Sequence, residues 1–230
     1  QACVISDEVR QLAGQIAQAK SGPAENVMRI MDWVSDNMKY DHARASLQAS
    51  AEHALKNHAG HCSDYHGLCA TLGRALGFPT RVAYGINTFA KNSPSHCKLE
   101  AFLPPYGWVT FDVSETQRLV ADIQMAGELD ANRKEALSRA ALDRLRRGFR
   151  DNTWFVQTRG TDYDLAPPAA KKVPVVRTIY AEADGKALPD PDPANPKQRE
   201  FAWMVAAKFN PDKPVTYPFK GWKSLEAKSP

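Results

Sequence analysis

Apolar residues near the start of the chain recur at the three- and four-residue spacing of amphipathic helices. In residues 6–19 they follow the polar run Ser6-Asp7-Glu8, which suits a helix start, and they comprise Val9, Leu12, Ala13 and Ile16. Pro23, which follows Ser21-Gly22, predicts the first turn of a second helix. Its apolar stripe comprises Val27, Ile30, Met31, Val34 and Met38. Both stripes indicate core helices, in which the methionines serve packing rather than ligand binding.

A cysteine lies at the start of a further predicted helix. After a short helical segment at 50–57, Gly60 turns the chain into residues 62–76, and Gly77 then stops the helix. One face of this helix is apolar and carries Tyr65, Leu68, Cys69, Leu72 and Leu76. Cys62 therefore falls in the first turn of a buried helix, where unpaired N–H groups and the helix dipole lower the pKa of a thiol.

The pattern then changes to short alternating runs that predict strands. They cover 80–88, 95–103 and 108–113, with turns at Asn92-Ser93-Pro94 and Pro104-Pro105-Tyr106-Gly107 between them. Such short connections favour antiparallel hairpins over parallel crossovers. Helices followed by a meander predict an α+β fold, with the helix of Cys62 packed on an antiparallel sheet.

Residues 128–150 return to helical spacing and are strongly basic, which indicates a solvated face or, alternatively, a docking surface for an anionic partner. Further strands are predicted at 152–160 and 173–185, the second ending in an Asp-Gly turn. The acidic stretch after residue 180 lacks the spacing of an EF-hand loop, so we interpret it as a solvated turn rather than a calcium site. Of the 16 prolines, 11 follow residue 160. We predict a domain over 1–184, with 128–150 as a helical insertion, and a proline-rich extension over 185–230 that packs on it.

Composition limits the class of protein. The 230 residues are 43% hydrophobic and 24% charged, as in soluble globular proteins, and contain no apolar run of the roughly 18 residues that a membrane span needs. The net charge of +4 is no evidence of nucleic-acid binding. Gln1 at the start suggests a processed or trimmed end, which predicts a periplasmic or secreted protein and leaves a lipid anchor on Cys3 open.

The four cysteines form neither a CxxC pair nor a metal-finger pattern, and we expect no metal and no cofactor. If Cys62 stays reduced, the others allow at most one disulfide. Cys3 would be its flexible partner, and the choice between Cys69 and Cys97 stays open.

A nucleophilic Cys62 needs an imidazole from another element, held by a carboxylate. His61 would point away from Cys62, and no carboxylate is clearly placed to orient His66, one helical turn on. Strand alternation instead puts His96, Lys98, Glu100 and Phe102 on one face of 95–103, opposite Cys97, Leu99, Ala101 and Leu103. Cys97 thus points away from His96 and is not expected to be a second nucleophile. If the next strand pairs with 95–103, His96 and Asp112 are cross-strand neighbours.

Three blocks of the chain resemble the transglutaminase-like superfamily: "GHCSDYHGLCATLGRALGFPTRVAYG", "HCKLE" and "YGWVTFD". Upstream, Trp33 and Tyr40 are similar to the helix and tyrosine that precede this core, and "RGTDYDLAPP" is similar to a stretch that follows it in bacterial members. The resemblance spans about 27–168. The chain departs from the family's pattern at His61, at Cys97 and at Lys98, where many relatives carry Trp.

The resemblance implies a papain-like fold and a catalytic triad of Cys62, His96 and Asp112. His96 would act as general base and then acid, Cys62 would form a thioester, and the backbone N–H of Cys62 would help to bind the oxyanion. We expect acyl transfer on amide bonds of a protein or peptide substrate, with hydrolysis favoured. Envelope peptides would suit an exported protein. The alternatives are glutamine–lysine crosslinking and a non-catalytic peptide-binding module with the same fold.

Overall fold

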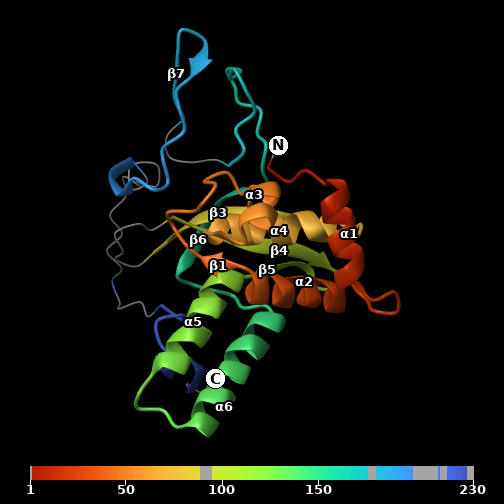
Figure 1. The fold of residues 1–230 in the computed structure, drawn as a ribbon, viewed down its shortest axis with the longest axis vertical. Coiled ribbons are helices and arrows are strands. Elements are labelled where there is room, and N and C mark those ends of the chain that lie inside the picture. The colour runs from red at the N-terminus through yellow and green to blue at the C-terminus, as the bar shows by residue number, and fades with distance from the viewer. Residues whose placement is uncertain (1, 89–94, 176–179, 199–211, 213–216, 227–230) are drawn as a thin grey trace.

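The computed structural model describes every residue except 1, 89–94, 176–179, 199–211, 213–216 and 227–230 (Figure 1). The helices are α1 (Asp7–Ile16), α2 (Pro23–Asn37), α3 (Ala51–Asn57), α4 (Cys62–Ala75), α5 (Val113–Met125), α6 (Ala131–Arg146) and α8 (Lys223–Glu226). The strands are β1 (Lys39–Tyr40), β2 (Ala59–Gly60), β3 (Thr80–Asn87), β4 (Ser95–Leu103), β5 (Gly107–Phe111), β6 (Trp154–Arg159), β7 (Glu182–Ala183) and β8 (Lys186–Ala187).

A four-stranded antiparallel sheet organises the fold, with strand order β5-β4-β3-β6. Helix α4 packs on β3 and β4, and the other N-terminal helices gather around it (Figure 1). The predicted meander of β3, β4 and β5 is therefore confirmed, as is the α+β class, and β6 extends the sheet beside β3.

The core between α4 and the sheet follows the predicted alternation. Cys97, Leu99, Ala101 and Leu103 of β4 belong to one buried apolar cluster with Leu68, Cys69 and Leu72 of α4. The face of β4 that carries His96, Lys98 and Glu100 is thereby turned away from this apolar cluster, and its charged groups are buried among other elements. One strand thus separates an apolar layer from a polar one.

Local sequence signals account for the helix starts. The Ser6 hydroxyl accepts a hydrogen bond from the Val9 N–H at 3.3 Å and caps α1, and Pro23 occupies the first turn of α2. Both helices, and the start of α4 at Cys62, lie where the apolar spacing predicted them.

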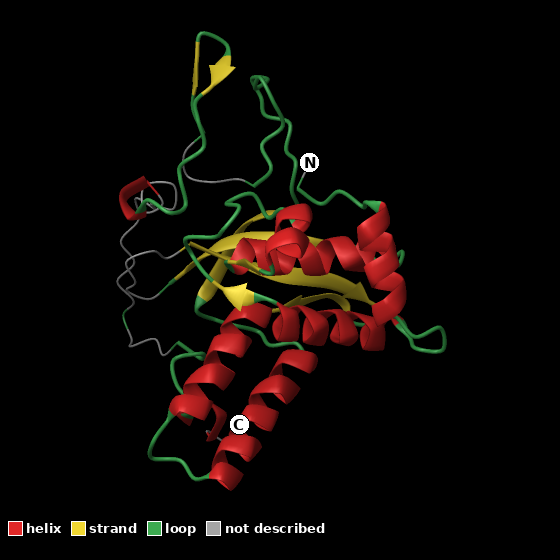
Figure 2. Cartoon of the chain, in the orientation of Figure 1, coloured by secondary structure: helices red, strands yellow, loops and turns green. Residues whose placement is uncertain are grey.

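The C-terminal half departs from the expectations in two places. The strand expected to reach residue 113 ends at Phe111, and Asp112 caps α5, a helix that the apolar spacing did not reveal. The expected strand at 173–185 is wrong over its described residues. Val173 bridges to Tyr163, Pro174 lacks an N–H for a ladder, and the next described strand is β7 at Glu182–Ala183; residues 176–179 lie outside the described part of the chain. The Asp-Gly turn is confirmed: Asp184 and Gly185 both have positive φ and close the β7–β8 hairpin at the top of Figure 2.

Helices α5 and α6 pack on each other beside the sheet, and the described end of the chain covers them (Figure 1). Phe219 is buried among Leu119, Ile123, Leu137 and Ala141. The Arg144 guanidinium donates to the Pro218 carbonyl at 3.2 Å, and Arg133 forms an ion pair with Glu226. Part of the predicted extension, including Phe201, Trp203, Met204 and Phe209, lies outside the described residues.

No helix in the described part of the chain has the length and apolar character needed to cross a membrane. All four cysteines are free, so the structure forms neither of the two disulfides considered for Cys3. The Cys3 thiol instead lies 3.7 Å from the Thr161 hydroxyl.

Candidate active site

The position of Cys62 is fixed by the junction of β2 and α4. Strand β2 pairs with β1 in parallel, Tyr40 opposite Gly60, and the helix starts two residues later. The Asp64 carboxylate accepts the His61 N–H at 3.1 Å and the Ser46 N–H at 3.2 Å, which ties the junction to the preceding loop. A Cβ at Gly60 would lie 2.4 Å from Asp64 Oδ2, so this close approach requires glycine.

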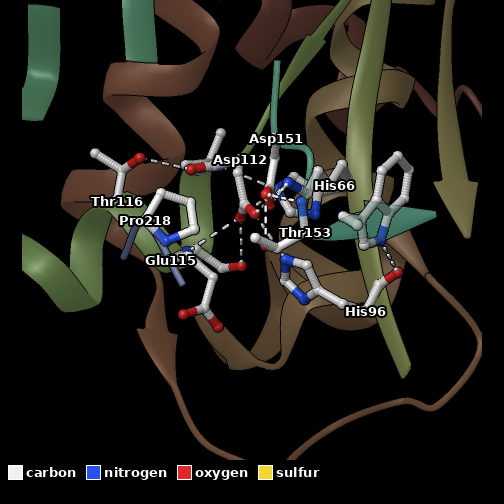
Figure 3. A network of polar contacts seen from close by, with 12 residues as sticks. His66, His96, Asp112, Glu115, Thr116, Asp151, Thr153 and Pro218 are labelled. Atoms are coloured by element: carbon white, nitrogen blue, oxygen red, sulfur yellow. Dashed lines mark hydrogen bonds and ion pairs between the residues drawn. The ribbon is translucent and has the colours of Figure 1, made fainter. Parts of the chain in front are cut away.

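His96 and Asp112 meet where β4 begins and β5 ends. Residues Leu99 and Phe111 are paired in the antiparallel register, and His96 reaches across to the first residue after β5. His96 Nε2 lies 2.7 Å from Asp112 Oδ2, and both side chains are buried (Figure 3). The predicted cross-strand proximity of His96 and Asp112 is confirmed.

The backbone of His96 is held from the other side by β6. The Trp154 indole N–H donates to the His96 carbonyl at 3.1 Å. Gly85 is paired with His96, and a Cβ there would lie 2.7 Å from the Trp154 ring and 2.3 Å from the Phe155 carbonyl oxygen. Gly85 thus permits the close approach by which Trp154 fixes His96.

The charge state of the pair follows from its surroundings. Burial by itself would lower the pKa of His96, but the charge of Asp112 and their hydrogen bond raise this pKa to about 10. Burial would raise the pKa of Asp112, yet the nearby His96 and Lys98 cations hold that pKa well below its usual range. At neutral pH the pair is an imidazolium and a carboxylate.

The pKa of Cys62 is lowered, whereas burial alone raises the pKa of a thiol. A hydrogen bond from Cys97 lowers the pKa of Cys62 most, and the hydrogen bond and charge of His96 add to this against the cost of burial. The pKa of Cys62 is therefore well below its usual value. Burial raises the pKa of Cys97 well above the ordinary value, so Cys97 stays a thiol and donates to Cys62. The face assigned to Cys97 was right, but Cys97 interacts with Cys62 across the core, which alternation on one strand did not reveal.

The two histidines near Cys62 in the sequence, His61 and His66, have different partners. His61 caps the helix, and its Nδ1 lies 3.4 Å from Asp64 Oδ2. His66 Nε2 accepts the Val113 N–H at 3.1 Å, and burial lowers the pKa of His66 to about 4, so its imidazole is neutral. Asp112 Oδ1 lies 3.9 Å from the same nitrogen, too far for a hydrogen bond, so the Val113 N–H and not a carboxylate orients His66.

Two charged residues at the site were missed by the sequence analysis. Lys98 Nζ lies 2.7 Å from Asp151 Oδ2 and 3.4 Å from Asp112 Oδ2 (Asp151 and Asp112 in Figure 3). The alternation of the strand already placed Lys98 on the same face as His96, and this pattern could have identified Lys98 as a site residue. Asp151 comes from the segment after α6, and nothing in its sequence surroundings pointed to β4.

Three further charged residues of the segments that resemble the superfamily form ion pairs, in which Arg81 and Arg159 both contact Glu100. Arg81 Nε lies 2.7 Å from Glu100 Oε2, and Arg159 Nε lies 3.1 Å from the same oxygen. The Arg81 guanidinium also lies 3.7 Å above the Trp108 ring. These contacts join β3, β4, β5 and β6 across the sheet, away from Cys62. Among the described residues, no group of three or more His, Cys, Asp and Glu side chains is arranged to hold a metal ion.

Comparison with known proteins relates part of the chain to a known family. Residues 10–113 match the transglutaminase-like superfamily. An uncharacterized protein of Haemophilus influenzae is 23% identical over 226 residues, covering 87% of this chain, and the chain spans 58% of that relative's length. A crystal structure described as a putative cysteine protease from Cytophaga hutchinsonii is 27% identical, with a TM-score of 0.44 over 50% of this chain and 39% of that one. Segment 10–113, a transglutaminase-like domain by its match, includes Cys62, His96 and Asp112.

Proposed function

We propose that the chain is a cysteine hydrolase that cleaves amide bonds of proteins or peptides through a thioester. One observation carries this proposal: a buried His96 imidazole lies 2.7 Å from Asp112 and interacts with a Cys62 thiol whose pKa is lowered. A thiolate beside an imidazolium, at the start of a helix, is the charge arrangement that attack on a carbonyl needs.

In the first half of the reaction, the Cys62 thiolate attacks the carbonyl carbon of the amide. The backbone N–H of Cys62, in the first turn of α4, is placed to donate to the oxyanion. The His96 imidazolium gives its proton to the departing amine as the C–N bond breaks. The products of this step are a thioester on Cys62, a free amine and a neutral imidazole.

In the second half, water replaces the amine. Neutral His96 takes a proton from the water as its oxygen attacks the thioester carbonyl, and the carboxylic acid product leaves with Cys62 returned to the thiolate. Asp112 keeps its charge throughout and stabilises each imidazolium that forms. Lysine in place of water would give crosslinking, which we consider the less favoured outcome.

Thiol labelling tests the nucleophile directly. Cys62 should react with iodoacetamide at pH 6 much faster than a model thiol of pKa about 8.5. Cys69 is the internal control, because burial raises its pKa far above the ordinary value. Mass spectrometry of the two peptides gives both rates in one sample. Labelling of Cys62 no faster than the model thiol, together with unchanged turnover in Cys62→Ala, would refute the proposal.

The acceptor is tested with a glutamine-rich protein and a fluorescent primary amine. We expect new N-termini or released ammonia without incorporation of the amine. Efficient incorporation that requires Cys62 would replace hydrolysis by transamidation as the activity.

A further inference from the structure

Lys98 is the most deeply buried lysine among the described residues, only 2% exposed, and it lies beside the proposed triad. Its Nζ forms a 2.7 Å ion pair with Asp151 Oδ2, and Asp151 Oδ1 in turn accepts the Thr153 N–H at 2.8 Å. Burying an ammonium is costly unless it is paired. A lysine retained in this position therefore calls for an explanation beyond packing.

The strand register explains how Lys98 reaches the site. Leu99 and Phe111 are the last pair of β4 and β5, so Lys98 and Asp112 are the next residues opposite each other. Asp112 Oδ2 accepts from His96 Nε2 at 2.7 Å and lies 3.4 Å from Lys98 Nζ. One carboxylate oxygen is thus shared between the imidazole and the ammonium.

Aromatic rings flank the buried Lys98, which also borders a wider cavity of about 210 Å³ together with Asp151 and Arg159. Lys98 Nζ lies 5.0 Å from the centre of the Trp154 ring and 5.6 Å from that of Phe219. A cavity of about 10 Å³, bordered by Lys98, Asp112, Arg144 and Phe219, has room for about one water molecule. Charges in such a place are weakly screened, so the position of each one matters.

We propose that Lys98 is a positioning residue that limits the basicity of His96; this inference rests on the proposed function. The ammonium competes with the imidazolium for Asp112 Oδ2, and it repels the imidazolium at short range. A less basic His96 gives its proton to the leaving amine more readily, and it becomes neutral for the attack of water. Asp151 opposes Lys98, because it draws the ammonium away from Asp112.

Other titratable or charged groups face this cluster and stay constant in the test below. They are His61 at the N-cap of α4, Cys62 and His66 of α4, Cys97 of β4, Glu115 of α5, Arg144 of α6, and Tyr40 and Tyr217. Removing Lys98 or Asp151 changes one charge among them, with opposite signs. An electrostatic role therefore predicts opposite effects, whereas damage to packing predicts effects in the same direction.

The experiment measures the pH dependence of Cys62 alkylation by iodoacetate. This anionic reagent needs the thiolate and is attracted by the imidazolium, so its rate rises with the titration of Cys62 and falls with that of His96. The peptide of Cys62 is quantified by mass spectrometry in the wild type, Lys98→Met, Asp151→Asn and the double variant. Arg139→Gln is the control, because it removes an exposed cation of α6 that pairs with Glu135.

We expect Lys98→Met to move the alkaline limb to higher pH by about one to two units, since both nitrogens contact one oxygen. The acid limb should move in the same direction by less. Asp151→Asn should move both limbs to lower pH, and the double variant should lie near the wild type, as should Arg139→Gln. If Lys98→Met does not fold, the pH shifts of Asp151→Asn and of the double variant test the role of Lys98.

Limbs that stay in place in every folded variant, or that move in the same direction in Lys98→Met and Asp151→Asn, would overturn the role of Lys98. A wild-type Cys62 that reacts as an ordinary thiol would give a different result. It would remove the proposed function together with this inference, and the two failures are therefore told apart in one data set.

Discussion

The two faces of β4 differ in the kind of contact that they make. On one face Cys97, Leu99, Ala101 and Leu103 pack under α4 in the apolar core. On the other face His96, Lys98 and Glu100 each bind a charged group from a distant part of the chain. Apolar packing needs only matching shape and volume, so many combinations satisfy it. The polar face needs specific partners at specific distances, and the loss of one leaves another charge unpaired.

The largest effect is expected from the polar face, on activity rather than stability. His96→Asn removes the group that holds and moves the proton, so turnover should fall by about 10³-fold or more. The acid limb of Cys62 alkylation should also move to higher pH, because the imidazolium no longer stabilises the thiolate. Turnover is measured on a peptide substrate and alkylation by mass spectrometry. A variant that keeps more than a tenth of wild-type turnover would contradict the role given to His96.

On the apolar face the effect should fall on stability. Leu99→Ala leaves a cavity beneath α4 and should lower the free energy of unfolding by about 3 kcal/mol, measured by urea denaturation. Phe102→Ala is the matched control on the opposite face, where the ring is 38% exposed. It should cost clearly less than Leu99→Ala. Equal losses in the two variants would show that the faces do not differ in packing.

Acid tests the residue of α4 that lies beside Asp112, without a change in packing. The pKa of His66 is lowered to about 4 in the folded chain, below the value of about 6.5 in an unfolded one. Between these values the unfolded chain binds the proton more readily, so stability is lost as the pH falls. From pH 7 to pH 5, His66→Gln should lose about 2 kcal/mol less than the wild type. Parallel losses in the two proteins, measured by denaturation at each pH, would be evidence against a buried neutral His66.

The smallest effect is expected where the polar face reaches solvent. The Arg159 side chain is 46% exposed, and its ion pair with Glu100 is one of two on that carboxylate. Arg159→Gln should cost less than about 1 kcal/mol, and less still in high salt. A loss in urea denaturation as large as that of Leu99→Ala would mean that the whole polar face, rather than its buried end, stabilises the sheet.

Local sequence patterns were sufficient to predict the helix and the strands around Cys62. The spacing of Tyr65, Leu68 and Leu72, with Gly60 before and Gly77 after, predicted α4 within about one residue of its ends. Alternation in β4 predicted which residues face the core. The resemblance to the transglutaminase-like superfamily then singled out His96 and Asp112 from the other histidines and acids.

Contacts between distant segments could not be predicted in this way. Lys98 and Asp151 are 53 residues apart, and their pairing depends on where α5 and α6 return the chain. Helix α5 was not predicted because Asp112 lies in a strand-like run, 108–113, and is also the cap of the helix. The Cys62–Cys97 interaction likewise crosses from α4 to β4. The exported location and the domain limits at 184 and 185 stay predictions.

Asp112 uses its two oxygens for different purposes. Oδ2 faces His96 and Lys98, while Oδ1 accepts the Glu115 N–H at 3.2 Å and starts α5. A gene that drifts toward a non-catalytic peptide binder would therefore meet unequal obstacles. Replacement of Cys62 would remove the proposed chemistry and leave the start of α5 intact, whereas replacement of Asp112 would remove both. Among descendants that have lost catalysis but kept the fold, the cysteine should disappear first and the aspartate should persist the longest.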